Sequence, residues 1–301
     1  MPELPEVHTT ATILNTLVKK KIITAVWTDY NSPHYSKKEN IKDPEYFKLF
    51  KKEVVGKKIL KVWRRAKNVL IDIGGYSTIL IHMKMTGHLL HGHFVFNKKE
   101  NIWTPTQEGP LQDSFNRFIH LVFSLNDGSS IVFCDMRKFA TVHLIKDEEA
   151  FTKKFETIGP EPLEESFDWK ILKDRLSKKP KQKIKTILMD QHMVAGIGNI
   201  YSDEVLWSSK INPERTVQDI QDFEFKLLTK HIKELLSKGI SFGGDSMSDY
   251  RNPYGLPGEF QLHHNVYRRT GQVCKRKFCE GIIQRKVING RSGHFCSLCQ
   301  K

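Results

Sequence analysis

Four of the five cysteines lie within the last 28 residues and are spaced as metal ligands. Four residues separate Cys274 from Cys279, sixteen residues follow, and two residues separate Cys296 from Cys299. Four thiolates in two close pairs match a tetrahedral structural zinc site, in which no coordination position is open to a substrate. Because a segment of about 30 residues cannot form a stable core alone, we expect one structural Zn²⁺ to supply its folding energy.

The first residues of the chain carry a second pattern that could do chemistry. Once Met1 is removed, Pro2 exposes a secondary amine with a pKa near ~8, and such an amine is a competent nucleophile toward a sugar carbon or an aldehyde. Glu3 and Glu6 are three residues apart, so they share a helix face beside that amine. Spacing alone favours a simpler interpretation, in which first-turn acids stabilise the helix dipole.

A glycine-broken turn lies within residues 185–207, between two apolar helical stretches. Gly196 and Gly198 leave backbone N–H groups unobstructed at the start of a helix, which suits a phosphate, and Asn199 is a favourable N-cap. Five lysines lie just upstream, between residues 178 and 185. By spacing alone, a phosphate site and an ordinary corner between two helices are equally good interpretations.

The composition points to a polyanionic partner. The chain has 301 residues, 39% of them hydrophobic and 27% charged, which excludes a disordered tail, a collagen-like fibre and a small disulfide scaffold. The formal net charge is +14, which favours nucleic acid or an anionic membrane face. No apolar run approaches the ~18–20 residues of a membrane span, and the N-terminus carries acids where a secretory signal carries bases. We therefore expect a cytoplasmic protein.

The elements that must position these residues follow from apolar periodicity. Residues 3–18 are predicted to form a helix, and residues 22–146 are rich in short β-type runs, which indicates a sandwich-like half. Residues 159–163 are typical of a linker. Beyond it we predict helices, followed by a long loop at 243–260 and a basic terminal module; the helices are expected at 168–177, 183–189, 199–208 and 216–238.

Three segments together resemble the formamidopyrimidine-DNA glycosylases. They are the opening Pro2-Glu-Leu-Pro-Glu-Val7, the stretch Gly196-Ile-Gly-Asn-Ile-Tyr201 and the terminal four-cysteine finger. The resemblance runs from residue 2 to about residue 300. It implies an α+β multidomain protein: an N-terminal catalytic β-sandwich with an N-terminal helix (1–146), a helix–two-turn–helix DNA-binding domain that includes a lesion-recognition loop at 243–260 (160–262), and a zinc finger (267–301).

The resemblance also implies an activity and a partner. The protein is expected to be a bifunctional DNA glycosylase/AP lyase of base excision repair that flips oxidised purines, 8-oxoguanine and formamidopyrimidines, out of duplex DNA. Excision would pass through a Schiff base and end in β,δ-elimination. The expected partner is double-stranded DNA with such lesions, with no membrane, and we expect a bacterial monomer associated with the nucleoid.

Catalytic roles carry over residue by residue where the motifs match. Pro2 would be the nucleophile at C1′ of the damaged nucleoside, and Glu3 the general acid/base at the sugar. Glu6 matches a second acid near that site. Lys67 matches a hairpin lysine that contacts phosphate and donates the proton in β-elimination. Arg291 matches the finger arginine that grips the phosphates of the flipped nucleotide and serves in δ-elimination.

Further matched positions concern the rest of the duplex. Backbone contacts are implied for Lys181, Lys185 and Asn199. A flipped base leaves a hole that must be filled, and the matching trio is Met85, Arg137 and Phe139, of which Arg137 is also a DNA contact. On spacing alone these three would be an ordinary core Met, core Phe and surface Arg. The 243–260 loop matches the segment that encloses the damaged base.

The chain departs from the family pattern in three places. The first cysteine pair is Cys-x4-Cys where the family usually has Cys-x2-Cys, so a wider turn is expected. A DNA-binding histidine of the family falls near Phe118, with His120 two residues on, and that contact stays unassigned. Residues 91–117 are longer than the usual connection and have no assigned role. Cys134 is expected to be a buried strand residue.

Two alternatives remain open at this stage. An endonuclease VIII-type glycosylase for oxidised pyrimidines usually opens Pro-Glu-Gly-Pro-Glu and carries Gly-Leu-Gly-Asn, so Leu4, Ile197 and the long 243–260 loop favour the purine enzyme. A non-catalytic zinc-finger DNA-binding protein fits the composition. It gives no reason, however, for the catalytic set to occur together, namely Pro2, Glu3, Lys67 and Arg291.

Overall fold

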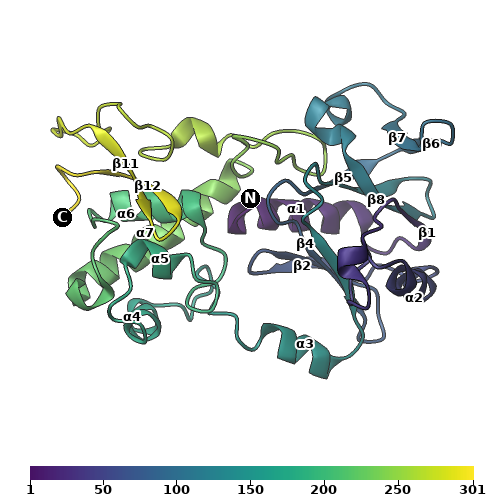
Figure 1. The fold of residues 1–301 in the computed structure, drawn as a ribbon, viewed down its shortest axis with the longest axis horizontal. Helices are drawn as coiled ribbons and strands as arrows, with labels where there is room; N and C mark the ends of the chain where they lie inside the picture. The colour runs from purple at the N-terminus through teal and green to yellow at the C-terminus, as the bar shows by residue number, and fades with distance from the viewer. The chain divides into compact units, whose positions relative to one another are not determined.

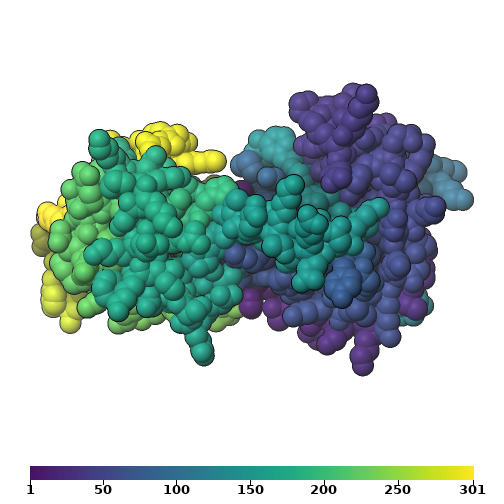
Figure 2. Space-filling model, turned by 90° about the horizontal axis from the view of Figure 1, so that it is seen from below, coloured from purple at the N-terminus to yellow at the C-terminus, as the bar shows by residue number.

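The computed structural model describes all 301 residues, which divide into two units. The first unit contains Met1–Glu156 together with Phe242–Glu259, and the second contains Thr157–Ser241 together with Phe260–Lys301. Figure 2 shows each unit closely packed on the face in view, with purple to teal residues in the first and mainly green to yellow residues in the second. None of the helices is both long and apolar enough to cross a bilayer.

The first unit contains two four-stranded antiparallel sheets. The first sheet has the strand order β1 (Ile23–Thr28), β8 (Ile119–Leu125), β9 (Ser130–Cys134) and β5 (His88–Gly92). The second has the order β10 (Thr141–Ile145), β4 (Thr78–His82), β3 (Asn68–Asp72) and β2 (Lys61–Arg65). All of the ladders are antiparallel. The short β-type runs predicted between residues 22 and 146 are therefore confirmed.

One hydrophobic core joins both sheets to the first helix. Helix α1 (Leu4–Val18) buries Val7, Leu14 and Val18 against side chains of both sheets (Figure 1). Helix α2 (Pro44–Val54), which the sequence did not reveal, contributes its buried residues at 50 and 54 to the same core. The core of the first unit thus holds α1 against both sheets.

The opposite face of the first sheet has its own covering, built from the unassigned residues 91–117. These form a hairpin of β6 (Phe94–Asn97) and β7 (Ile102–Pro105), then the 3₁₀ turns η2 (Pro110–Gln112) and η3 (Ser114–Arg117). A second buried cluster under this segment includes Leu90, Val122 and Val132 of the sheet. Cys134 is buried in the same cluster, as predicted.

The second unit is helical and ends in a hairpin. Its helices are α4 (Trp169–Ser177), α5 (Ile184–Leu188), α6 (Asn199–Ser208) and α7 (Asp222–Ser241), with 3₁₀ turns η4 (Val217–Asp219) and η5 (Phe260–His263). Strands β11 (Ile283–Ile288) and β12 (Arg291–Cys296) form the terminal hairpin. In the first unit, a last helix, α3 (Glu148–Phe155), follows β10.

Three local features differ from the sequence predictions. The long helix begins at Asp222 rather than near residue 216, because the separate turn η4 precedes it. Gly198, not Asn199, is the N-cap of α6, so Asn199 becomes the first helical residue. Residues 242–259, expected with the helical domain, pack within the first unit because their buried polar groups bond to α1 and to β5.

Candidate active site

The N-terminal pattern forms a buried polar cluster. Pro2 is buried, and Glu3 and Glu6 are only 2% and 1% exposed. The Glu3 N–H donates to Oε2 of Glu6 at 2.7 Å, a capping-box contact that fixes the backbone next to Pro2. The structure therefore brings together the three N-terminal residues that the sequence singled out.

Glu6 is held by two backbone donors in a buried position. Its Oε1 accepts the Asp245 N–H at 2.7 Å, while Oε2 accepts that of Glu3. Burial, followed by the charge of Glu3, raises the pKa of Glu6 to about 7 even though both N–H donors oppose the shift. Glu6 therefore exchanges a proton near neutral pH.

The loop at 242–259 is seated on α1 through the same residue. Gly244 has a left-handed φ of +91°, and a Cβ there would lie 2.8 Å from Cγ of Glu6, so only glycine allows the approach. Tyr250 donates from its hydroxyl to the Glu6 carbonyl at 3.0 Å and lies 3.3 Å from Oγ1 of the buried Thr10. The segment expected to enclose the base is thus fastened beside the N-terminus.

Lys67 lies in the tight turn between β2 and β3. Arg65 and Asn68 pair across this turn, and Ala66 adopts a left-handed φ of 51°. The Lys67 side chain is largely buried. Its charge is one of the effects that, after burial and the charge of Lys84, lower the pKa of His82 to about 3. A buried ammonium at a hairpin tip is a rigidly placed cation.

The three residues expected to fill the void lie together on two loops. An Arg137 terminal nitrogen lies 3.3 Å from Sδ of Met85, and its guanidinium is 4.5 Å from the centre of the Phe139 ring. Met85 and Phe139 are 41% and 47% exposed, so both side chains are accessible at the surface. The sequence did not reveal the supports: Thr86 donates to buried Asp135 at 2.6 Å and accepts the Arg137 N–H at 3.1 Å.

The His120 side chain is held by neighbouring residues of the first unit. Its Nδ1 lies 2.9 Å from a carboxylate oxygen of Asp29, and its ring packs 5.4 Å from that of Tyr30. The ring is thus held inside the unit, and the Phe118 side chain carries no group that could bind a phosphate.

In the second unit, a cationic pocket surrounds Arg291. The pocket has a volume of about 570 Å³ and is lined by polar residues from α6, from the segment before the finger and from the finger hairpin. Three of them are arginines, at positions 268, 285 and 291, and Asn199 and His294 lie among the others. The structure therefore brings Arg291 and Asn199 together, in a pocket suited to an anion.

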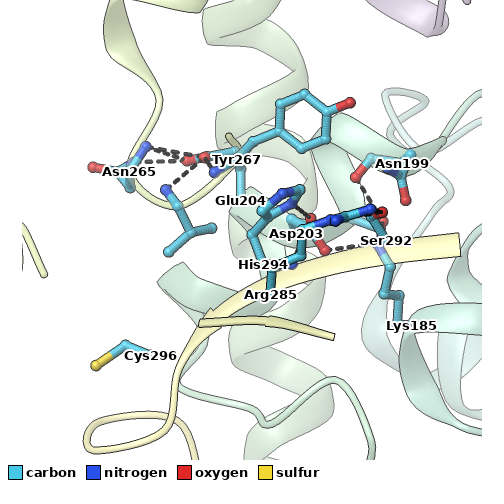
Figure 3. Close-up of polar contacts among 12 residues, drawn as sticks. Lys185, Asn199, Asp203, Glu204, Asn265, Tyr267, Arg285, Ser292, His294 and Cys296 are labelled. Carbon is cyan, nitrogen blue, oxygen red and sulfur yellow. Dashed lines mark hydrogen bonds and ion pairs between the residues drawn. The ribbon is translucent and has the colours of Figure 1, made fainter. Parts of the chain in front are cut away.

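The lysines expected to contact DNA separate into two kinds. Lys181 is exposed, as a phosphate contact requires. Lys185 is 0% exposed, and its Nζ lies 2.6 Å from Oδ1 of Asp203, whose other oxygen accepts the His294 N–H at 2.9 Å (Figure 3). The burial and pairing of this ammonium argue against a direct backbone contact by Lys185, which stays a prediction.

The residue after Asp203 fixes the chain that leads into the finger. Glu204 is fully buried, and its carboxylate accepts the N–H groups of Asn265, Val266 and Tyr267, each at 2.9 Å (Figure 3). Sequence reasoning missed this residue, although two consecutive acids directly before the apolar stretch Val205–Trp207 were a usable signal. A buried carboxylate requires this kind of multiple donation.

The turn before α6 is locked internally. The Gly196 N–H donates to Oε1 of Gln191 at 2.8 Å, and Nε2 of Gln191 donates to the Ile197 carbonyl at 2.8 Å. The Gly196 N–H therefore already has an acceptor within the protein. The groups near this turn that remain suited to a phosphate are Asn199 and the arginines of the pocket.

The four terminal cysteines form a cluster that fits a metal. Their Sγ atoms all lie within 4.8 Å of one another, with separations of 3.8 Å for Cys274–Cys299 and 3.7 Å for Cys279–Cys296. Tetrahedral zinc with Zn–S bonds of about 2.3 Å requires S–S separations of roughly 3.8 Å. The Trp207 indole N–H donates to Sγ of Cys274 at 3.2 Å, as an outer-shell partner of a metal thiolate does.

Comparisons with known proteins agree with this architecture along the whole chain. Residues 1–142 match the formamidopyrimidine-DNA glycosylase N-terminal domain, residues 158–251 match the H2TH domain of the same enzymes, and residues 271–301 match the zinc finger found in FPG and IleRS. These domains, with the buried acids and the cysteine cluster, define a DNA glycosylase of base excision repair.

Relatives and solved structures narrow the class to one family. Formamidopyrimidine-DNA glycosylases from Bacillus subtilis and Pediococcus pentosaceus are 35% and 36% identical, each covering 100% of this chain and 99% of the relative. A solved complex of Lactococcus lactis Fpg with abasic-site DNA has a TM-score of 0.83 at 32% identity, covering 99% of both chains. The chain belongs to the formamidopyrimidine-DNA glycosylase family.

A second solved structure is equally similar. A mutant of the Lactococcus lactis Fpg, in complex with Fapy-dG containing DNA, has a TM-score of 0.83 and 32% identity over 100% of both chains. The sequence-based predictions of the family, the fold class and the three kinds of domain are therefore confirmed.

Proposed function

We propose that this chain excises oxidised purines, 8-oxoguanine and formamidopyrimidines, from duplex DNA and then cleaves the abasic strand. The observation that carries the proposal is the buried cluster of Pro2, Glu3 and Glu6 at the start of α1. Two acids buried beside an N-terminal amine are costly to desolvate, and one of them has a raised pKa, which is typical of a functional site.

The first step uses the Pro2 nitrogen as nucleophile. The lone pair of this nitrogen attacks C1′. The glycosidic bond breaks, and the electron pair of that bond leaves with the base, which is protonated. Loss of the N–H proton then frees the nitrogen lone pair, and Glu3 protonates the ring oxygen O4′. The C1′–O4′ bond breaks as the C1′=N bond forms, which opens the sugar ring and leaves a cationic iminium at C1′. The iminium acidifies C2′, so the 3′ phosphate leaves by β-elimination and the 5′ phosphate follows by δ-elimination. Met1 must be absent, because an acylated nitrogen has no available lone pair.

The remaining residues bind and position the DNA. The arginine pocket around Arg291 supplies planar donors for phosphate oxygens, and Lys67 supplies a rigid cation. The exposed side chains of Met85, Arg137 and Phe139 form one apolar and cationic wedge that suits the space left by a flipped base. One Zn²⁺ held by the four cysteines would fold the finger without taking part in chemistry.

Covalent trapping tests this mechanism directly. Borohydride should reduce the iminium on an 8-oxoguanine duplex and leave a cross-link on Pro2. Pro2→Gly should lower excision sharply because the amine changes in basicity and position, and Glu3→Gln should block base release with the amine intact. An adduct on Lys67, with Pro2→Gly fully active, would refute the assignment.

The choice of duplex tests the substrate class. Three matched duplexes are compared, bearing 8-oxoguanine, thymine glycol or undamaged guanine. The protein should nick the 8-oxoguanine duplex fastest and should not nick the undamaged duplex. Preference for thymine glycol would favour the endonuclease VIII-type alternative. Comparison of cytosine and adenine opposite 8-oxoguanine then gives the opposite-base preference.

A further inference from the structure

The segment 91–117 has no role in the proposed mechanism, yet it is a folded element. Trp27 of β1 packs against Phe96 and Trp103 of the hairpin, with ring centres 5.4 and 5.8 Å away. Buried Asn116 donates to the Pro110 carbonyl at 2.9 Å and pairs with His88 of β5, also at 2.9 Å. The segment is therefore fastened to the first sheet at both of its ends.

This fastened segment holds the 242–259 loop through an ion pair. Asp113 accepts hydrogen bonds from Nε and a terminal nitrogen of Arg251, both at 3.1 Å, and the guanidinium lies 4.6 Å from the Phe115 ring centre. The other terminal nitrogen donates to the carbonyls of Ser248 and Tyr250 at 3.1 and 2.9 Å. One guanidinium thus ties two loop carbonyls to the inserted segment.

Two backbone contacts reinforce the ion pair. The His91 N–H, at the end of β5, donates to the Pro253 carbonyl at 2.8 Å. Gly255 has a φ of +84°, and a Cβ there would lie 2.7 Å from the carbonyl oxygen of Pro110, so the loop backbone rests directly on η2. With the Glu6 and Tyr250 contacts described above, the loop is attached at two places, one on α1 and one on the inserted segment.

We propose that residues 91–117 are a brace that pre-organises the 242–259 loop for recognition of the damaged base, with Asp113 and Arg251 as positioning residues. The inference rests on the proposed function, in which this loop encloses the base. A loop ordered before DNA binds loses less conformational entropy when it closes on its ligand. The brace therefore matters for steps that need the base and not for cleavage of an abasic strand, which has no base to enclose.

The test compares two reactions of the full-length protein. Single-turnover excision of 8-oxoguanine and cleavage of an abasic duplex are measured for Asp113→Ala, for Arg251→Ala and for the double variant. Glu108→Ala is the matched control, because it removes an exposed acid from the same segment. Hydrogen exchange of residues 246–256 reports the order of the loop without DNA.

The brace predicts a split between the two reactions. Each single variant should lower excision by on the order of tenfold, as loss of a charge-assisted partner does, with abasic cleavage within about twofold of wild type. The double variant should be close to the poorer single variant, because each single variant already removes the ion pair. Exchange at 246–256 should accelerate in all three, while Glu108→Ala should change neither reaction.

Two results would overturn the proposal. Unchanged excision by Asp113→Ala would show that the ion pair does not position the loop, and equal losses in both reactions would show that it only maintains the fold. Failure of the wild-type protein to excise 8-oxoguanine or to cleave abasic DNA would instead refute the proposed function.

Discussion

Replacing Lys185 by methionine separates a structural role from a DNA contact. Methionine keeps the approximate length and volume of the side chain but removes the ammonium that lies 2.6 Å from Asp203 and 3.2 Å from Oγ of Ser202. Both members of the ion pair are at most 1% exposed, so water cannot replace the lost partner. Asp203 would then keep only His294 as a partner for its second oxygen.

The magnitude follows from burial. Removing one partner of a buried ion pair typically costs about 3–5 kcal/mol, because the other charge stays buried without compensation. Adding Asp203→Asn to Lys185→Met removes that charge, so the double variant should recover part of the loss, on the order of 1–2 kcal/mol. This recovery would distinguish an uncompensated charge from a loss of packing.

The assay pairs denaturant unfolding with the salt dependence of DNA affinity. Hydrogen exchange along β12 assigns the unfolding to the second unit. Below the unfolding transition, the slope of log affinity against log salt should be unchanged in Lys185→Met. The exposed Lys181, changed to alanine, should reduce that slope by about one phosphate contact.

One result would refute the reasoning. If Lys185→Met unfolds at the wild-type denaturant concentration but shows a shallower salt slope, Lys185 contacts the DNA backbone and the buried ion pair is not its main role.

Two further predictions concern protons and metal. Because the pKa of Glu6 rises from 4.5 to about 7 on folding, the folded protein holds a proton that the unfolded chain releases, so stability should fall as pH rises from 4.5 to 7. In denaturant unfolding at several pH values, Glu6→Gln should reduce the change in the free energy of unfolding between pH 4.5 and 7 by about 3 kcal/mol. An unchanged dependence of that free energy on pH would contradict the raised pKa of Glu6. Chelation of the metal, or Cys296→Ser, should unfold residues 267–301 and weaken DNA binding while the first unit stays folded. If metal analysis finds no zinc in protein that binds DNA with full affinity, the finger does not need a structural zinc ion.

Much of the fold could be predicted because its signals are local. Short β-type runs located the strands of both sheets except β5, and helical spacing located α1 and α6 almost to the residue. The signal for helix α2 was local too, since Tyr46, Phe47, Phe50 and Val54 recur at helical spacing on the side that packs against the core. The hairpin of β6 and β7 was missed because it packs on an outer sheet face through aromatic contacts distant in sequence.

The site shows the same division between local and distant information. Spacing identified the four cysteines as metal ligands and placed Glu3 and Glu6 on one helix face, because each set lies within a short stretch of chain. The catalytic roles proposed for the two acids came from the family resemblance. Nothing local indicates that Asp135 supports the Met85 loop, or that Asp113 pairs with Arg251 across 138 positions. The burial of Lys185 could not be predicted because a lysine in a basic run is usually solvated, and only the fold reveals the carboxylate of Asp203 beside it.

The buried charges bear on DNA binding beyond the individual sites. Nine of the 34 acidic residues are buried but only four of the 48 basic residues are, so the surface is more basic than the net charge of +14 suggests. The buried acids bond inward: Glu204 to the chain before the finger, Asp203 to β12 and Asp135 to the Arg137 loop. Carboxylates used in this way stabilise the elements that carry the cations while no longer repelling phosphate at the surface. The hydrogen bonds that bury these carboxylates therefore do two things: they hold the elements of the site in place, and they leave the exposed surface of the protein cationic.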